Sequence, residues 1–305
     1  MRPVAGRFFC CVEMFFAPVH RCFDFLTKFA ASSEVMKINR DQPIGVFDSG
    51  IGGLTVARAI VKLLPLENMI YFGDTAHLPY GDKSEAAIQA YSVKIAEVLL
   101  RKRCKVIVIA CNSASSAAYE LLREYVGKNV RIINVIDPMI DLVSTKFEGR
   151  QIGLIGTKRT VQSGVYVRKI NELNTHITVQ SLATPLLVPM IEEGFFNNQI
   201  SHEIIAQYLS DPILEGIEAL ILGCTHYPLI KDEIQAYYKN NLPILDSSET
   251  VVAALKDYLQ ENDLLNETDG AQHNFLVSDY TESFEASARL FFRKTVNLEK
   301  HPLWD

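Results

Sequence analysis

Short runs of apolar residues alternate along the chain with amphipathic segments of helical period. Continuous Val/Ile/Leu runs are typical of parallel strands that are buried on both faces, and strand–helix alternation is typical of a doubly wound α/β sheet. The expected strands are Ile44–Phe47, Met69–Phe72, Val106–Ala110, Ile132–Ile136, Ile152–Ile155, Ile177–Ser181, Ala219–Leu222 and Pro243–Leu245. The expected helices are Leu54–Leu64, Ser84–Arg101, Ser115–Tyr125, His202–Leu209 and Val251–Leu259. Because ligands of such sheets bind outside the carboxyl ends of the strands, we expect the functional residues in the loops that follow them.

Composition excludes several classes of protein. The net charge is −6 and no block of Lys/Arg stands out, so we expect no nucleic-acid partner. No apolar stretch approaches the ~18 residues that span a bilayer, so we expect no membrane partner. Six cysteines in 305 residues, without a C-x-x-C pair, argue against a disulfide scaffold and a structural zinc site. We therefore expect no metal and a reducing, cytoplasmic location.

Residues 1–35 differ from the rest of the chain. They hold half of the cysteines and show neither helical nor strand periodicity. Charged Glu13, Arg21 and Asp24 interrupt the apolar runs, which makes a poor signal peptide. We expect that Met36 is the natural start and that residues 1–35 are an extension outside the fold. The main alternative is a targeting or membrane-surface segment.

The sequence carries a faint internal repeat. Ile44–Ser49 (IGVFDS) is echoed by Ile152–Thr157 (IGLIGT), and each is followed by a later strand that ends at a cysteine, Cys111 or Cys224. This indicates two similar parallel-sheet lobes, related by pseudo-two-fold symmetry, that face each other across a cleft. We expect residues 37–134 and 246–305 to form the first lobe and residues 135–245 to form the second.

Two cysteines at such equivalent positions suggest proton transfer. Cys111 lies at a strand-to-helix junction, where a helix N-terminus favours a thiolate, and Asp48 is a candidate partner for it. Cys224 has His226 two residues further on, and an imidazole can take the thiol proton or stabilise the thiolate. One thiol would remove a proton from a substrate carbon while the other delivers a proton to its opposite face.

Such a reaction needs donors that stabilise a carbanion. Candidate donors are the side chains of Ser49, Asn112, Ser113, Thr157, Thr160 and Thr225. No lysine stands in an evident Schiff-base context, so the sequence requires no pyridoxal cofactor. Three other interpretations stay open: a cysteine hydrolase that uses Cys224, a metal enzyme that uses Cys111, Cys224 and His226, and a two-lobed module that only binds small anions.

Four motifs surround these residues: IGVFDSGIGGLTV (44–56), YFGDTAHLPYG (71–81), ACNSAS (110–115) and LGCTHYPL (222–229). Together they resemble glutamate racemases, members of the cofactor-independent aspartate/glutamate racemase superfamily. The resemblance extends from about Ile44 to Leu259, and residues 1–35 have no counterpart in it. It implies interconversion of L- and D-glutamate without a cofactor, in supply of peptidoglycan synthesis, by a homodimer. Another racemase of the superfamily is the alternative.

The resemblance also implies roles for single residues. Cys111, assisted by Asp48, would be the base toward D-glutamate, and Cys224, assisted by His226, the base toward L-glutamate. The residues implied to line the substrate pocket are Ser49, Pro79, Tyr80, Gly81, Asn112, Ser113, Thr157, Thr160, Thr225 and Glu192. Adjacent Glu193 leaves the last assignment open, and Ser113 stands where many relatives carry threonine.

Other polar residues near these motifs have weaker signals. Gly50-Ile51-Gly52-Gly53 lacks the third glycine of a dinucleotide loop, since Thr55 stands there, and no Gly-Lys-Ser/Thr follows, so we interpret it as a tight turn toward an anionic substrate. Asp74 and His77 are expected to cap a loop, with a minor role in shaping the turn Pro79–Gly81. Trp304 belongs to no motif, and we expect a surface or packing role.

Overall fold

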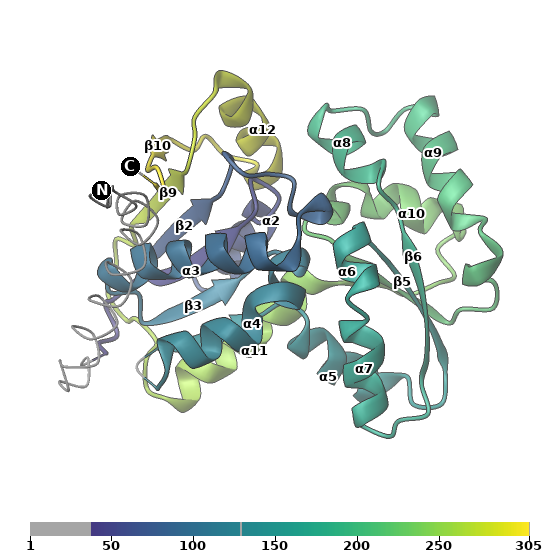
Figure 1. Cartoon of the computed structure of the whole chain (residues 1–305), viewed down its shortest axis with the longest axis horizontal. Helices are drawn as coiled ribbons and strands as arrows, with labels where there is room; N and C mark the ends of the chain where they lie inside the picture. Colours follow the sequence, from purple (N-terminus) through teal and green to yellow (C-terminus); the bar gives the residue numbers. More distant parts are fainter. Residues whose placement is uncertain (1–37, 129, 305) are drawn as a thin grey trace, which may run out of the picture. The chain divides into compact units, whose positions relative to one another are not determined.

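The computed structural model describes residues 38–128 and 130–304, and its strands form two sheets. The first sheet contains β1 (Ile44–Asp48), β2 (Met69–Gly73), β3 (Val106–Ile109), β4 (Arg131–Asn134), β9 (His273–Val277) and β10 (Leu298–Lys300). The second contains β5 (Gln151–Gly156), β6 (Thr178–Ala183), β7 (Ala219–Gly223) and β8 (Ile244–Asp246). All strand pairs are parallel. We call each sheet with its helices a lobe, first and second (Figure 1).

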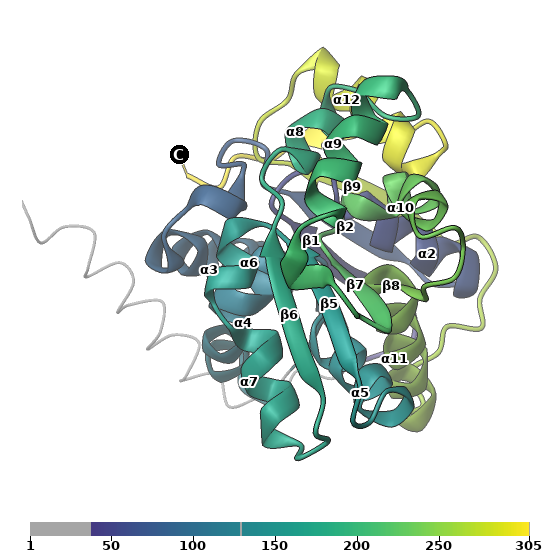
Figure 2. The same cartoon turned by 90° about the vertical axis from the view of Figure 1, so that its right-hand side faces the viewer.

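The two sheets repeat one strand order. The first reads β10-β9-β2-β1-β3-β4 and the second reads β6-β5-β7-β8, so four consecutive strands in each lobe are arranged as second, first, third, fourth. Figure 2 shows the strands of the second sheet side by side. The predicted α/β class with two parallel-sheet lobes is confirmed. Because the order is the same, the loops after β3 and β7, which carry the two candidate cysteines, occupy equivalent positions.

Helices cover both faces of the first sheet. The helix α3 (Glu85–Arg101) packs on α4 (Asn112–Val126), while α2 (Leu54–Leu63) packs on α11 (Ser247–Glu261) and α12 (Glu282–Phe292). The remaining helices are α5 (Asp137–Lys146), α6 (Lys158–Gln162), α7 (Val165–Glu172), α8 (Leu187–Glu192), α9 (Gln199–Leu209) and α10 (Lys231–Tyr237). Short 3₁₀ turns are η1 (Tyr80–Asp82), η2 (Pro212–Leu214) and η3 (Tyr227–Ile230).

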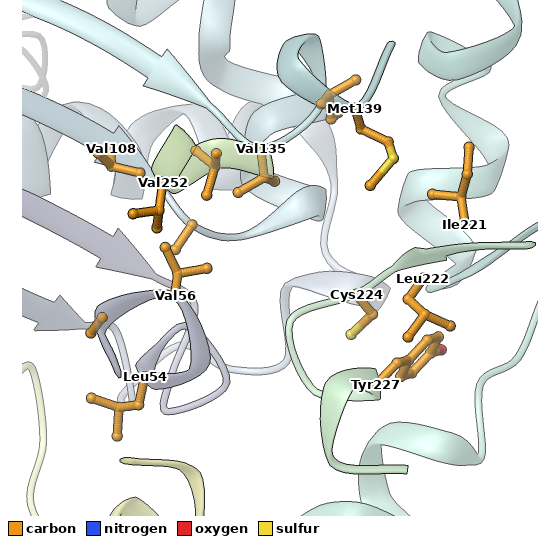
Figure 3. Close-up of a cluster of buried hydrophobic side chains, with 14 of the residues drawn as sticks. Leu54, Val56, Val108, Val135, Met139, Ile221, Leu222, Cys224, Tyr227 and Val252 are labelled. Atoms are coloured by element: carbon orange, nitrogen blue, oxygen red, sulfur yellow. The ribbon is translucent and has the colours of Figure 1, made fainter. Parts of the chain in front are cut away.

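The chain passes between the lobes twice, once through α5 and once through α11, and a buried apolar cluster fills this junction. In Figure 3 the cluster continues from Val56 and Val252 through Val135 and Met139 to Ile221. Burial of these side chains removes apolar surface from water and stabilises the junction.

Several elements were not expected from the sequence. They are β9 and β10, which extend the first sheet beyond β2, and the helices α5, α6, α7, α8, α10 and α12. The helix expected to begin at Ser115 begins at Asn112, because the Cys111 sulfur caps it. The residue boundaries of the lobes stay a prediction. The proposed extension 1–35 and the start at Met36 lie outside the described residues and also stay predictions.

Candidate active site

The loops that follow the strands of both lobes enclose one pocket of about 150 Å³, comparable to a cavity that holds benzene. Cys111 and Cys224 both line it. The other predicted residues that line it are Ser49, Pro79, Tyr80, Gly81, Asn112, Ser113, Thr157, Glu192, Thr225 and His226. Asp48 and Thr160 are buried behind the lining. Most of the predicted site residues therefore lie around one cavity between the lobes.

Cys111 caps the helix that follows it. Its sulfur accepts a hydrogen bond from the backbone N–H of Ala114 at 3.4 Å and donates one to Ser49 Oγ at 3.6 Å. Burial, together with the nearby Asp48 charge, raises the pKa of the Cys111 thiol to about 12, although its hydrogen bonds with Ala114 and Ser49 act in the opposite direction. The helix N-terminus thus acts in the predicted direction but is outweighed by desolvation, and at neutral pH the group is a thiol.

Cys224 faces an imidazole that is held on three sides. His226 Nδ1 lies 3.7 Å from the Cys224 sulfur, and Nε2 lies 2.9 Å from Glu192 Oε1. The edge of the Phe291 ring meets the imidazole at 5.1 Å between centroids. Burial opposes the imidazolium, but the hydrogen bonds with Cys224 and Glu192 outweigh it and raise the pKa of His226 to about 10. A charged His226 can therefore stabilise a thiolate at Cys224.

The acidic partner of His226 is Glu192 at the end of α8. The sequence alone left Glu192 and Glu193 as alternatives, and the structure places Glu192 against the imidazole, while Glu193 caps the helix.

Asp48 joins the two lobes from behind the pocket. Its carboxylate accepts hydrogen bonds from the Gly50 N–H at 3.1 Å and from Thr225 Oγ1 at 3.4 Å. Burial raises the pKa of Asp48, while the charge of His226 and the surrounding backbone N–H groups lower it. Among the described contacts of Asp48 there is no hydrogen bond to Cys111, whose nearest polar side-chain partner is Ser49. The influence of Asp48 on Cys111 is therefore electrostatic.

The glycine-rich turn after β1 brings the first lobe close to His226. A Cβ atom at Gly52 would lie 2.4 Å from Cε1 and Nδ1 of His226, and one at Gly53 would lie 2.5 Å from the Asp48 Cβ. We expected this turn to present backbone N–H groups to an anion. Gly50 does line the pocket, but its N–H is bonded to Asp48, and Gly52 and Gly53 allow close packing instead.

Polar side chains complete the pocket wall between the two lobes. Ser113 and Thr157 share a hydrogen bond of 2.9 Å, and Thr160 supports Thr157 at 3.1 Å. Asn112 Oδ1 accepts from the Tyr166 hydroxyl at 2.8 Å, whereas Asn112 Nδ2 is buried and has no partner among the described residues. This free donor can bind an acceptor of a ligand, such as a carboxylate oxygen.

Several lining residues escaped the sequence analysis. Asp82 and Lys158 line the pocket and pair with each other at 3.3 Å, and Thr184 and Val188 also line it. Lys158 directly follows predicted Thr157, so its place in the same loop was an available signal. Thr184 was missed because the strand before it was expected to end at Ser181, whereas β6 continues to Ala183.

Within residues 38–128 and 130–304, no helix is both long enough and apolar enough to span a membrane. No group of three or more His, Cys, Asp or Glu side chains among them is arranged to hold a metal ion.

Known proteins are similar to this chain in sequence and in fold. The model of the Asp/Glu/hydantoin racemase family matches residues 44–255, and the chain belongs to this family. A relative in Neisseria meningitidis, glutamate racemase, is 39% identical over 260 residues, which are 85% of this chain and 96% of the relative.

Solved structures are similar over the same range. Glutamate racemase of Francisella tularensis in complex with D-glutamate is 38% identical, with a TM-score of 0.82, and covers 87% of this chain and 99% of its own. Glutamate racemase of Thermus thermophilus in complex with β-chloro-D-alanine is 39% identical, with a TM-score of 0.79, over 87% and 98% of the two chains.

Proposed function

We propose that this protein is a glutamate racemase, an isomerase that interconverts L- and D-glutamate without a cofactor. The observation that carries the proposal is the pair of buried cysteines, which follow equivalent strands of two lobes and line one pocket. The similar proteins in Neisseria, Francisella and Thermus carry the same name, and the Francisella structure contains D-glutamate.

The proposed reaction moves one proton off the substrate and another onto it. The Cys224 thiolate takes the α-proton of L-glutamate and becomes a thiol, while the Cys111 thiol gives its proton to the opposite face of the carbanion. D-glutamate forms and Cys111 is left as the thiolate, from which the reverse reaction begins. The two sulfurs thus exchange roles in each turnover, and their combined proton count is unchanged.

Each sulfur has a different source of stabilisation in this scheme. For Cys224 it is the imidazolium of His226, which Glu192 holds in place. In the described part of the chain no cation offsets the burial that raises the pKa of the Cys111 thiol. The ammonium group of bound glutamate would supply the missing positive charge. We therefore expect deprotonation of Cys111 to depend on bound substrate.

The carbanion needs preorganised donors around the substrate carboxylate. Asn112 Nδ2, which has no partner in the described part of the chain, is the best placed of them by burial and lining. We propose that Ser49, Ser113, Thr157 and Thr225 contribute the others, with Thr160 acting through Thr157.

The test follows the circular dichroism of L-glutamate with purified full-length protein and no added pyridoxal phosphate. We expect the signal to decay to zero. Cys111→Ser and Cys224→Ser should each slow racemisation at least about 10³-fold, because a hydroxyl is a far weaker acid than a thiol. A constant signal from a folded sample would reject glutamate racemisation, and substantial turnover in either serine variant would reject the two-base scheme.

Two alternatives are separated by α-proton exchange in heavy water. A racemase for another amino acid would exchange the α-hydrogen of that amino acid faster than that of glutamate in a panel of L-amino acids. A non-catalytic anion-binding module would bind glutamate without any exchange.

The cellular setting is part of the proposal. D-glutamate would supply peptidoglycan synthesis in the cytoplasm, and the active form would be a homodimer without nucleic-acid or membrane partners. Light scattering of the purified protein tests the oligomeric state, and a monomer at working concentration would contradict it.

A further inference from the structure

A buried carboxylate organises the loop that forms one wall of the pocket. Asp74, the first residue after β2, is fully buried and accepts three hydrogen bonds. They come from His77 Nδ1 at 2.7 Å, the Tyr80 hydroxyl at 2.6 Å and Ser278 Oγ at 2.6 Å. Tyr80 and its neighbours Pro79 and Gly81 line the pocket. The position of this turn therefore depends on what fixes Asp74 and His77.

His77 is enclosed by two aromatic rings from distant parts of the chain. Its imidazole stacks on Tyr91 of α3, with 4.3 Å between centroids and 21° between planes. The ring of Trp304 meets it edge-on at 5.1 Å and 77°, and also meets Tyr91 at 5.6 Å and 82°. Edge-to-face contacts of this kind are favourable beyond the area that they bury. Trp304 itself does not line the pocket.

The segment that carries Trp304 is attached to the first sheet. The His301 backbone N–H donates to the Val277 carbonyl at 2.7 Å, and the His301 ring meets Phe72 edge-on. Lys300 Nζ pairs with Asp279 at 2.6 Å. These contacts hold the end of the chain beside β9 and place Trp304 against His77.

We propose that Trp304 is a positioning residue for substrate binding, which acts through His77 and Asp74 to hold the turn Pro79–Gly81 against bound glutamate. This inference rests on the proposed function for its substrate, but not for the contacts themselves. The contacts that support the turn act on free and reacting substrate alike, so their loss raises KM and leaves kcat nearly unchanged.

The first experiment needs no substrate. Hydrogen–deuterium exchange of the full chain is compared for wild type, Trp304→Ala and Trp304→Phe, with Tyr237→Ala as control. Tyr237 is a matched aromatic residue, since it is 38% exposed against 45% for Trp304 and also makes an edge-on contact, but with Tyr238 in the second lobe. Trp304→Ala should speed exchange in residues 75–83 roughly three- to tenfold, and neither Trp304→Phe nor the control should do so.

The second experiment measures kinetics on the same four proteins. We expect roughly three- to tenfold higher KM for glutamate in Trp304→Ala, kcat within about twofold of wild type, and rescue by Trp304→Phe. Unchanged KM, or an equal fall of kcat and kcat/KM, would overturn the positioning role. Unchanged exchange in residues 75–83 would overturn the contact pathway.

The third experiment uses the wild-type chain alone. Trp304 is the single tryptophan of the sequence, so its emission reports this contact without labelling. If the contact favours glutamate binding, bound glutamate must favour the contact by the same factor. Acrylamide quenching of the emission should therefore decrease as D-glutamate saturates the protein, and unchanged quenching would refute the coupling. Absence of racemisation in wild type would instead reject the proposed function, while the exchange experiment still decides whether Trp304 supports the turn.

Discussion

Replacing Gly52 by alanine tests whether the position of His226 controls one half of the reaction. Gly52 lies in the first lobe, and His226 lies in the second. An alanine Cβ would lie 2.4 Å from the imidazole and 2.6 Å from Thr225 Oγ1, whereas ordinary contacts begin at 3.4 Å. The backbone of Gly52 has no positive φ, so the alanine itself is not strained. The ring has to move by about 1 Å, and a displacement of that size can cost ~10²-fold in rate.

Displacement of the His226 ring weakens its contacts with Cys224 and Glu192 but does not affect Cys111. The distances from Nδ1 to the Cys224 sulfur, 3.7 Å, and from Nε2 to Glu192, 2.9 Å, leave little room for such a shift. Cys111 does not contact His226, so we expect only proton transfer at Cys224 to slow. L- and D-glutamate have equal free energies in water, so kcat/KM must fall by the same factor, about 10²-fold, in both directions. Rates alone therefore cannot show which sulfur is affected.

Primary isotope effects can show which of the two sulfurs is affected. With α-deuterated L-glutamate, the isotope effect on kcat/KM should increase in Gly52→Ala, because abstraction by Cys224 becomes more rate-limiting. With α-deuterated D-glutamate it should decrease toward unity, because the slow step is then protonation by Cys224. Gly45→Ala in β1 is the control. Its Cβ would lie 3.0 Å from the Cys104 sulfur, so it should lower the free energy of unfolding by about 1–3 kcal/mol without altering either isotope effect. Equal isotope effects in the two directions, or a wild-type kcat/KM, would refute the reasoning.

Two further predictions concern buried charges. Glu192→Gln removes the carboxylate that holds His226, so the alkaline limb of kcat/KM should move to lower pH by about 1–3 pH units; an unmoved limb would contradict the role of this pair. The free energy of unfolding that charged His226 contributes is fully present below pH 6.5 and is lost as pH rises through about 10. Denaturant titrations across that range should show a smaller loss of this free energy in Glu192→Gln than in wild type. Lys105→Met leaves Glu67, which it pairs with at 2.6 Å, as an uncompensated buried charge, and should reduce the free energy of unfolding by about 3–5 kcal/mol. Chemical denaturation measures this, and the double variant with Glu67→Leu should recover most of the loss; a single variant as stable as wild type would show that the pair is not coupled.

The central strands could be predicted because they are continuous apolar runs. β1, β2 and β3 are buried throughout, and their sequences contain little else than apolar residues. β10 could not be predicted in this way, because Leu298–Lys300 is a short, partly exposed edge strand with two charged residues. Short helices such as α6 have too few turns to show a period. Their place is decided by tertiary packing.

Site residues could be predicted where a reactive side chain closely follows an expected strand. Cys111 and Cys224 stand within two residues of a strand end, with His226 two residues after Cys224, so the rule for parallel sheets places them in one region. The pKa of Cys111 was not predictable, because burial outweighs the helix N-terminus only once neighbouring atoms have displaced water. The contact between Trp304 and His77 joins residues more than 200 positions apart that share no motif, and only the structure brings them together.

The position of β9 and β10 in the sequence affects the order in which the protein folds during translation. These strands belong to the first sheet, yet the whole second sheet is encoded before them. During translation the first sheet therefore remains without two of its strands until the second has left the ribosome, and Ser278 and Trp304 reach the Asp74 network last. A chain truncated after residue 300 would keep both cysteines and all strands of both sheets but would lack Trp304, which supports His77 beside the pocket.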